Sequence, residues 1–247
     1  RGERIRPTTI ALLASQGLAN VTVGGQVNAA IVSTGDEVVT PGSKLDQGQI
    51  YDSNSILLQA LVQRCGASVT SAEHCPDQSE RLIEAIQRGI KNHVLVLAGG
   101  VSVGEHDLVR ATLRSLGAKI DIWRVAIKPG KPFLFGQVSG CSVFGLPGNP
   151  VSTFVTFLQF VRPAILKMMG ANNFDLPKTP VRLTVDLANE GDRTHYVRGR
   201  IENGTFLPIG RQESHALFGL SQSNALLRVV VGESLKAGAI VDVQTWD

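Results

Sequence analysis

Residues 93–104 read HVLVLAGGVSVG, and this stretch decides the expected fold class. Its first six residues are His93 and an unbroken apolar run, VLVLA, which is typical of a strand covered on both faces, as in a parallel sheet. Glycines follow directly, where the chain must turn tightly after the strand. We therefore expect a buried strand that ends in a glycine-rich loop at the carboxyl edge of a parallel sheet.

The flanking sequence repeats the order of strand, turn and helix. Further strands or extended segments are expected at 27–33, 67–71, 119–127, 133–137 and 141–146. Helical spacing marks residues 52–64, 78–90, 107–116 and 149–169. In the first of these helices, Asp52 or Ser53 is the expected N-cap, and the helical stripe comprises Ile56, Leu57, Ala60, Leu61 and Arg64. This alternation predicts a three-layer α/β domain around a mostly parallel sheet.

The composition changes after Gly170. A linker rich in Asn and Pro leads into short segments in which apolar and polar residues alternate, which predicts a small C-terminal β-barrel domain. Its strands are expected at 181–187, 194–202, 205–209, 226–231 and 239–245. We thus divide the chain into an α/β domain at 27–171 and a β domain at 172–247, while residues 1–26, with one short helix at 8–15, belong to neither.

Charge and cysteine content exclude several classes of protein. The 24 Lys and Arg residues exceed the 21 Asp and Glu residues by only three, so we expect neither a nucleic-acid partner nor a membrane partner. Three scattered cysteines without a CxxC pair favour reduced thiols and a cytoplasmic location, although a Cys65–Cys75 disulfide stays open. The HExxH, Walker A and GxGxxG patterns are absent from the sequence.

Three loops follow predicted strands, at the sheet edge where open α/β sheets bind their ligands. Residues 33–37 read STGDE, which alone would suit a plain polar turn. In the loop at 99–107, glycines can aim N–H groups at an oxyanion, and Asp107 suits a helix N-cap as well as a cation ligand. The loop at 147–152 reads PGNPVS, in which Asn149 is the expected N-cap and Pro150 the first helical residue, so the helix end favours an anion.

A cationic segment, WRVAIKPGKP, lies between the second and third loops at residues 123–132. Strand alternation would place Arg124, Ala126 and Lys128 on one face, so that two positive charges could meet in one pocket. A solvated strand edge is the alternative interpretation. Together with the three loops, this segment indicates metal and anion chemistry, with carboxylates for a hard cation such as Mg²⁺ and N–H groups and lysines for phosphate or another oxyanion.

In this order, STGDE, GQIYDSN, GGVSVGEHD, IKPGKP and GLPGNPVS resemble the molybdopterin molybdenumtransferases, the family that includes the E domain of gephyrin. The resemblance covers residues 27–170 and, more weakly, 181–243, where YVRG at 196–199 and QESH at 212–215 match. It assigns residues 1–26 to the remainder of an N-terminal domain I. It also implies that a further N-terminal stretch completes the active cleft, so this chain alone is expected to lack turnover.

The resemblance implies Mg²⁺-dependent insertion of molybdate into adenylylated molybdopterin, with release of AMP. It further implies a homodimer and, as another partner, the adenylyltransferase that acts one step earlier. The expected metal ligands are Glu37, Asp77 and Asp107, and the expected catalytic residues are Asp77, Asp107 and Lys128. The residues expected to bind molybdopterin or molybdate are Thr34, Gly35, Gly99, Gly100, Ser102, Gly104, Arg124, Lys131, Pro147, Gly148, Asn149, Pro150, Arg198 and Ser214.

Three alternative functions share this sequence pattern. The same α/β fold serves the molybdopterin adenylyltransferases and pyrophosphatases of the competence-protein type, and the gephyrin relationship raises a scaffold that binds receptor peptides. The trailing β domain favours molybdenum insertion over the first two, and nothing in this sequence specifically marks a groove for receptor peptides. The sequence does not distinguish molybdate from tungstate, because both are tetrahedral dianions of nearly equal size.

Overall fold

A six-stranded sheet forms the centre of the molecule in this computed structural model, which describes residues 1–101 and 108–246. Its strands lie in the order β4 (Ser68–Cys75), β1 (Asn28–Thr34), β5 (Val94–Ala98), β9 (Cys141–Leu146), β8 (Leu134–Val138) and β6 (Lys119–Trp123). The first four run parallel, whereas β8 and β6 each run antiparallel to their neighbours. The predicted mostly parallel sheet is confirmed.

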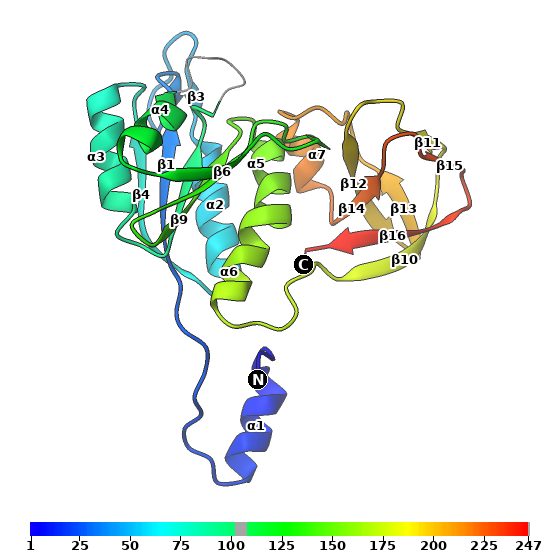
Figure 1. The fold of residues 1–247 in the computed structure, drawn as a ribbon. Helices are drawn as coiled ribbons and strands as arrows, with labels where there is room; N and C mark the ends of the chain where they lie inside the picture. Colours follow the sequence, from blue (N-terminus) through cyan, green and yellow to red (C-terminus); the bar gives the residue numbers. More distant parts are fainter. Residues whose placement is uncertain (102–107, 247) are drawn as a thin grey trace.

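Helices cover both faces of this sheet (Figure 1). On one face lie α2 (Ser53–Arg64) and the long helix formed by α5 (Pro150–Thr156), η1 (Phe157–Val161) and α6 (Arg162–Met168); on the other lie α3 (Ser79–Gly89) and α4 (Leu108–Ser115). In β5, Val94 and Val96 pack with the first group, while Leu95 and Leu97 pack with the second. The uninterrupted apolar run is thus explained by the cover on its two faces.

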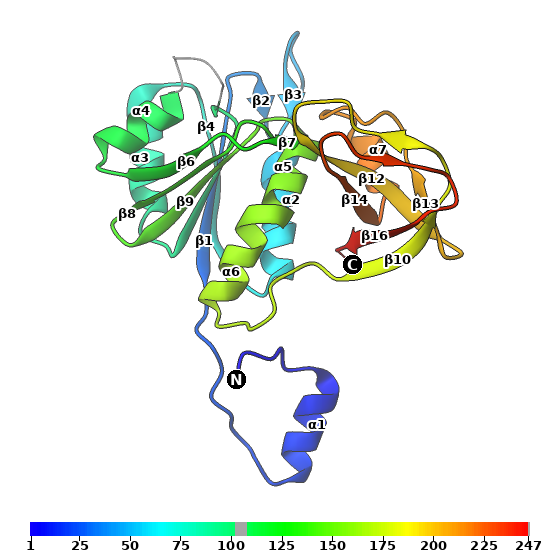
Figure 2. The same ribbon diagram turned by 45° about the vertical axis from the view of Figure 1, so that its right-hand side comes forward.

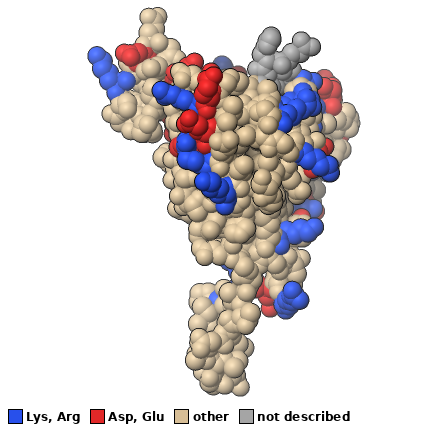
Figure 3. Space-filling view, turned by 60° about the vertical axis from the view of Figure 1, so that its left-hand side comes forward, with Lys and Arg blue, Asp and Glu red and all other residues tan. Residues whose placement is uncertain are grey.

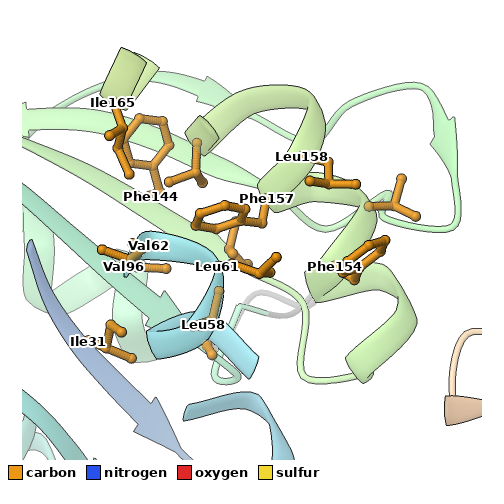
Figure 4. Packing of buried hydrophobic residues seen from close by; sticks show 14 of the residues in the cluster. Ile31, Leu58, Leu61, Val62, Val96, Phe144, Phe154, Phe157, Leu158 and Ile165 are labelled. Atoms are coloured by element: carbon orange, nitrogen blue, oxygen red, sulfur yellow. The ribbon is translucent and has the colours of Figure 1, made fainter. Parts of the chain in front are cut away.

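Helix α2 begins at the predicted N-cap and buries one of its faces. The Asp52 carboxylate accepts the Ser55 N–H at 2.9 Å, as expected of an N-cap. The helix then buries Leu58, Leu61 and Val62 against the long helix (Figure 4) and leaves Ile56 58% exposed. Of the predicted stripe, Leu61 is buried and Leu57 packs against the core, whereas Ile56 and Ala60 are exposed. The prediction was only partly right, because two overlapping apolar stripes share the helical period and the sequence alone does not choose between them.

The predicted helix at 149–169 contains a π-helical turn, η1, that was not expected. Pro163 follows it and has no N–H to donate to the carbonyl of Gln159, four residues earlier. Loss of that hydrogen bond accounts for the widened turn.

A closed barrel of five strands makes up the C-terminal part. Around the barrel lie β13 (Thr205–Pro208), β10 (Lys178–Leu183), β16 (Ile240–Thr245), β14 (Ala225–Val229) and β12 (Thr194–Glu202), and a β12–β13 pairing closes it. The predicted barrel is confirmed. A ribbon of β11 (Leu187–Ala188) and β15 (Ser234–Leu235) and a short helix, α7 (Leu217–Ser221), complete this part. The domain boundaries at 26/27 and 171/172 stay a prediction.

A two-residue strand, β7 (Ile127–Lys128), leaves the α/β part and pairs with β12 of the barrel. The expected continuous extended segment at 119–127 is wrong, because Arg124 has a φ of 77° and interrupts it after β6. Figure 2 shows the barrel beside α5, and the Phe154 and Trp246 rings meet edge to face across this contact, with centroids 5.0 Å apart.

The N-terminal segment extends away from both parts (Figures 1 and 2). Its helix α1 (Pro7–Ser15), predicted at 8–15, buries no residue. A small ribbon of β2 (Val38–Val39) and β3 (Ile50–Tyr51) projects beyond the carboxyl edge of the sheet.

The surface and the cysteines add three further observations. On the face shown in Figure 3, positive and negative side chains are scattered among uncharged ones. Within the described residues, no helix has both the length and the apolar character to cross a membrane. All three cysteines are free thiols, which rules out the Cys65–Cys75 bridge in this structure.

Candidate active site between the sheet edge and the barrel

The carboxyl ends of four neighbouring strands, β4, β1, β5 and β9, meet at one edge of the sheet. The loops that follow them line a cleft of about 1200 Å³, together with the segment after β7 and a loop of the barrel. The predicted site residues that line it are Thr34, Gly35, Glu37, Asp77, Gly99, Gly100, Lys128, Lys131, Pro147, Gly148, Asn149, Pro150 and Ser214. Three others, Ser102, Gly104 and Asp107, lie outside the described residues.

Gly99 and Gly100 allow the β5 loop to approach the end of β1. Both have positive φ values, 88° and 63°, which glycine adopts without strain. A Cβ on Gly99 would lie 2.6 Å from the Thr34 carbonyl oxygen, and one on Gly100 would lie 2.7 Å from the Thr34 hydroxyl. The two loops are therefore in main-chain contact, and any side chain at these positions would separate them.

The acidic side of the cleft comes from the ends of β1 and β4. The Asp36 carboxylate accepts the Asp77 N–H at 3.0 Å, which holds the two loops together. Partial burial, followed by the negative charges of Asp36 and Glu37, raises the pKa of Asp77. Crowded carboxylates of this kind favour a bound cation, because a cation relieves their mutual repulsion.

Glu37 and Asp77 both line the cleft, but within residues 1–101 and 108–246 no group of three or more His, Cys, Asp and Glu side chains is placed to hold a metal ion. Mg²⁺ commonly binds to one or two carboxylates and takes its other ligands from water and substrate phosphates. The two carboxylates fit that mode of binding.

The cationic side comes from β7, from the segment after it, and from the residue that precedes β12. Lys128, Lys131 and Arg193 line the cleft. Arg124 does not line it, and its predicted place beside Lys128 was wrong: the guanidinium lies 4.4 Å from the centre of the Trp123 ring. The positive φ of Arg124 turns the chain there, so the strand alternation assumed between Arg124 and Lys128 does not exist.

The loop at 147–152 connects the α/β part to the barrel. Asn149 precedes the first helical residue, Pro150, as predicted, but its side chain does not cap the helix. It donates instead to the Ser214 hydroxyl at 2.9 Å, and the Ser214 carbonyl accepts the Val151 N–H at 3.1 Å. Ser214 is thereby held at the cleft by two hydrogen bonds from the opposite part of the molecule.

Arg198, expected to bind substrate, lies beneath the cleft wall and does not line it. Only 1% of its surface is exposed, and its guanidinium donates to the carbonyls of Arg211 and Glu213. Arg193, five residues earlier, supplies the guanidinium at the cleft instead. Sequence reasoning missed Arg193 because only the long-range β7–β12 pairing brings it beside the lysines.

Two buried polar atoms in the cleft wall have no hydrogen-bond partner among the described residues, namely Thr34 Oγ1 and Asn54 Oδ1. The other end of the Asn54 amide donates to the Gly148 carbonyl at 2.6 Å. Since buried polar groups are normally paired, these two atoms are suited to contact a bound ligand.

Two family models match this sequence. The one described as "Probable molybdopterin binding domain" matches residues 30–167, and the one described as "MoeA C-terminal region (domain IV)" matches residues 180–246. The chain belongs to the molybdopterin-binding domain family. The matching C-terminal model accounts for the barrel, so this family member carries both modules in the order predicted.

Relatives and solved structures agree with this assignment. The family member is 36% identical over its whole length to "Molybdopterin molybdenumtransferase" of Haemophilus influenzae, and 37% identical over 94% of its length to that of Nostoc sp.. It spans 63% and 55% of these two relatives. A molybdopterin biosynthesis MoeA protein from Pyrococcus horikoshii superposes on all of it with a TM-score of 0.88 at 29% identity, over 61% of that chain. The resemblance to the molybdopterin molybdenumtransferases is confirmed.

Proposed function

We propose that this protein inserts molybdate into adenylylated molybdopterin and releases AMP. A single observation carries the proposal: one cleft presents the carboxylates Glu37 and Asp77 together with Lys128, Lys131 and Arg193. A substrate with a phosphoanhydride needs a cation near its phosphates, and a tetrahedral dianion needs positive charge and hydroxyl donors. The names of the relatives support the same reaction.

The side chains would divide this work. Lys128, Lys131, Arg193 and the Ser214 hydroxyl would bind the molybdate oxygens, while the N–H groups around Gly99 and Gly100 would face the phosphates. Glu37 and Asp77 would hold Mg²⁺, which neutralises phosphate charge when bound. Two substrates fixed side by side in one cleft react with a much smaller loss of entropy than two free in solution.

The adenylylated substrate must come from an enzyme that transfers an adenylyl group from a nucleotide, so an adenylyltransferase is the proposed partner upstream. A homodimer and a cytoplasmic location belong to the same proposal and rest on the resemblance to the family. The scaffold function has no comparable support, because the relatives carry the name of an enzyme.

The test is AMP release from adenylylated molybdopterin with molybdate and Mg²⁺, measured on the full-length protein. Asp77→Asn should lower the rate by about 100-fold, as expected when one charged group at the reacting phosphates is lost. Its melting temperature should stay the same or rise, because burial and the charges of Asp36 and Glu37 raise the pKa of Asp77 and so disfavour its charged form. Adenylylation of molybdopterin from ATP in the same assay would overturn the proposal in favour of the adenylyltransferase.

Lys128→Ala tests the anion side separately. The molybdate concentration for half-saturation should rise by about tenfold, the effect of losing one charged hydrogen bond. Melting should change little, because Lys128 is exposed and such groups add little to folding. Lys119→Ala, at a lysine with 81% of its side chain exposed and paired with Asp121, is the matched control. Equal loss of affinity in both variants would contradict the assignment.

A further inference from the structure

Arg198 is the largest fully buried side chain among the described residues, and its contacts concern the wall of the cleft. Its two terminal nitrogens donate to the carbonyls of Arg211 and Glu213, the first at a short distance and the second at 3.2 Å. These carbonyls belong to the barrel loop that carries Gln212, Glu213 and Ser214 to the cleft. The guanidinium thus binds this loop on the side that is turned away from the cleft.

The main chain of Arg198 is bound to the same loop. The Gln212 side chain accepts the Arg198 N–H at 2.9 Å and donates to the Arg198 carbonyl at 3.0 Å. The Ile209 N–H donates to that same carbonyl at 3.2 Å. Backbone and side chain of one residue therefore fix both ends of the segment 209–213.

The charge of Arg198 has no matching ion pair in the part of the chain that the structure describes. Burial lowers its pKa, and the negative charge of Glu213 only partly offsets that effect. A buried cation without a paired carboxylate is expensive, and Nε has no partner among the described residues. Stability alone gives no reason for an arginine here, whereas the fork of a guanidinium can hold two carbonyls at a fixed separation.

Gly219 in α7 provides the space that this arrangement needs. A Cβ at position 219 would lie 3.3 Å from Arg198 Nε and 3.4 Å from its terminal nitrogen. Even an alanine there would press on the guanidinium, so the helix backbone and the guanidinium are fitted to each other.

We propose that Arg198 is a positioning residue, which holds the loop 211–214 so that the Ser214 hydroxyl faces the bound oxyanion. This assigns Arg198 a role behind the cleft wall, in place of the direct contact with substrate expected from the sequence. The expected loss of molybdate affinity without Arg198 rests on the function proposed above. The expected loosening of the loop 211–214 does not depend on that function, since it follows from the hydrogen bonds alone.

The experiment compares Arg198→Lys, Gly219→Ala and a control, Arg182→Met, in the full-length protein. Lysine keeps the charge but offers a single point of donation, and Gly219→Ala moves the guanidinium without touching the cleft. Arg182 also donates to a barrel carbonyl, that of Gly238 at 2.8 Å, but away from the cleft. Three measurements are made on each variant: amide hydrogen exchange, calorimetric titration with molybdate, and the KM for molybdate beside kcat.

Both test variants should accelerate exchange of the amides at 211–215 while the rest of the barrel keeps the wild-type rates. Molybdate affinity should fall on the order of tenfold, as for other residues that orient a ligand-binding group, and KM should rise more than kcat falls. Arg182→Met should leave all three measurements unchanged. A uniform rise in exchange over the barrel would overturn the proposal in favour of a purely structural role.

Two more outcomes distinguish a failure of this proposal from a failure of the proposed function. If exchange at 211–215 increases while molybdate affinity stays at the wild-type value, the link between the loop and the oxyanion is wrong. If the wild-type protein neither binds molybdate nor releases AMP, the proposed function fails, while faster exchange at 211–215 in both variants would still support the hold of Arg198 on the loop.

Discussion

His195 is a single residue whose protonation is set by the junction of the two parts. It lies on β12 opposite Lys128 of β7, and its Nε2 is buried without a hydrogen-bond partner among the described residues. Burial, followed by the charges of Lys128, Arg198 and Arg193, lowers the pKa of His195 to about 4. The imidazole is therefore neutral at pH 7, which keeps a further positive charge away from the cations that line the cleft.

This shift predicts an acid-sensitive stability. The pKa of His195 is depressed from 6.5 to about 4 in the folded protein, so the unfolded chain binds the proton first. The stabilisation is present above pH 6.5 and is lost as the pH falls from 6.5 towards 4. The shift corresponds to at most about 3 kcal/mol, and partial exposure of the ring reduces the expected effect to about 2 kcal/mol.

Urea unfolding at pH 7 and pH 4.5 measures this effect. His195→Gln, which cannot take up a proton, should lose about 2 kcal/mol less than the wild type between the two pH values. His215→Gln, at a histidine with 70% of its side chain exposed, controls for the loss of a histidine as such. The same acid sensitivity in wild type and His195→Gln would show that other groups cause it.

At the scale of elements, the loop after β5 depends on its first glycine. Gly99→Ala would require a side chain at a φ of 88° and place Cβ 2.6 Å from the Thr34 carbonyl oxygen. The backbone strain and the clash together should lower the free energy of unfolding by about 2–4 kcal/mol. Gly117→Ala has a similar φ of 81° but no atom within 4 Å of the new Cβ, so it should cost only about 1 kcal/mol. Denaturant unfolding of both variants checks the difference, and equal losses would mean that the contact with Thr34 yields without strain.

Some of the helices, strands and loops could be predicted from the sequence. The strands β1, β5 and β9 and the loops after them were found because apolar runs and glycines are local signals, and parallel order then brings those loops to one edge. The buried face of α2 was only partly predicted, because it depends on a choice between overlapping stripes. The π-turn was missed, because it depends on Pro163.

The cationic side of the site was only partly predictable. Lys128 and Lys131 lie in a local motif, but Arg193 reaches the cleft only through the pairing of two strands about 65 residues apart in the sequence, a relation that periodicity does not contain. Arg124 and Arg198 have the charge expected of ligands, yet one stacks on Trp123 and the other is buried behind the wall. Charge in a motif thus identified the region, and packing decided which cations face the cleft.

At the scale of the whole molecule, the cleft exists because the α/β part and the barrel hold a fixed orientation. Strand pairing joins β7 to β12, Asn149 bonds to Ser214, and Gln159 Nε2 donates to Gln244 Oε1 at 2.9 Å. The edge-to-face contact of Phe154 with Trp246 adds an aromatic pair to this junction. Since Lys128 and Ser214 come from opposite sides of it, any rotation of the barrel would separate the groups proposed to share the oxyanion.

Trp246→Ala tests this dependence of the cleft on the junction. Truncation of the half-buried indole should lower stability by about 2 kcal/mol, below the range for fully buried aromatic residues. Because each part has its own core, the loss should fall on the junction, so calorimetric melting should broaden or divide into two transitions. Molybdate affinity should fall in parallel, although Trp246 does not line the cleft. Phe218→Ala, at an aromatic residue of the barrel that is 80% exposed, should retain one transition and wild-type affinity. A single unchanged transition with full affinity in Trp246→Ala would show that the other contacts of the junction maintain the orientation without this indole.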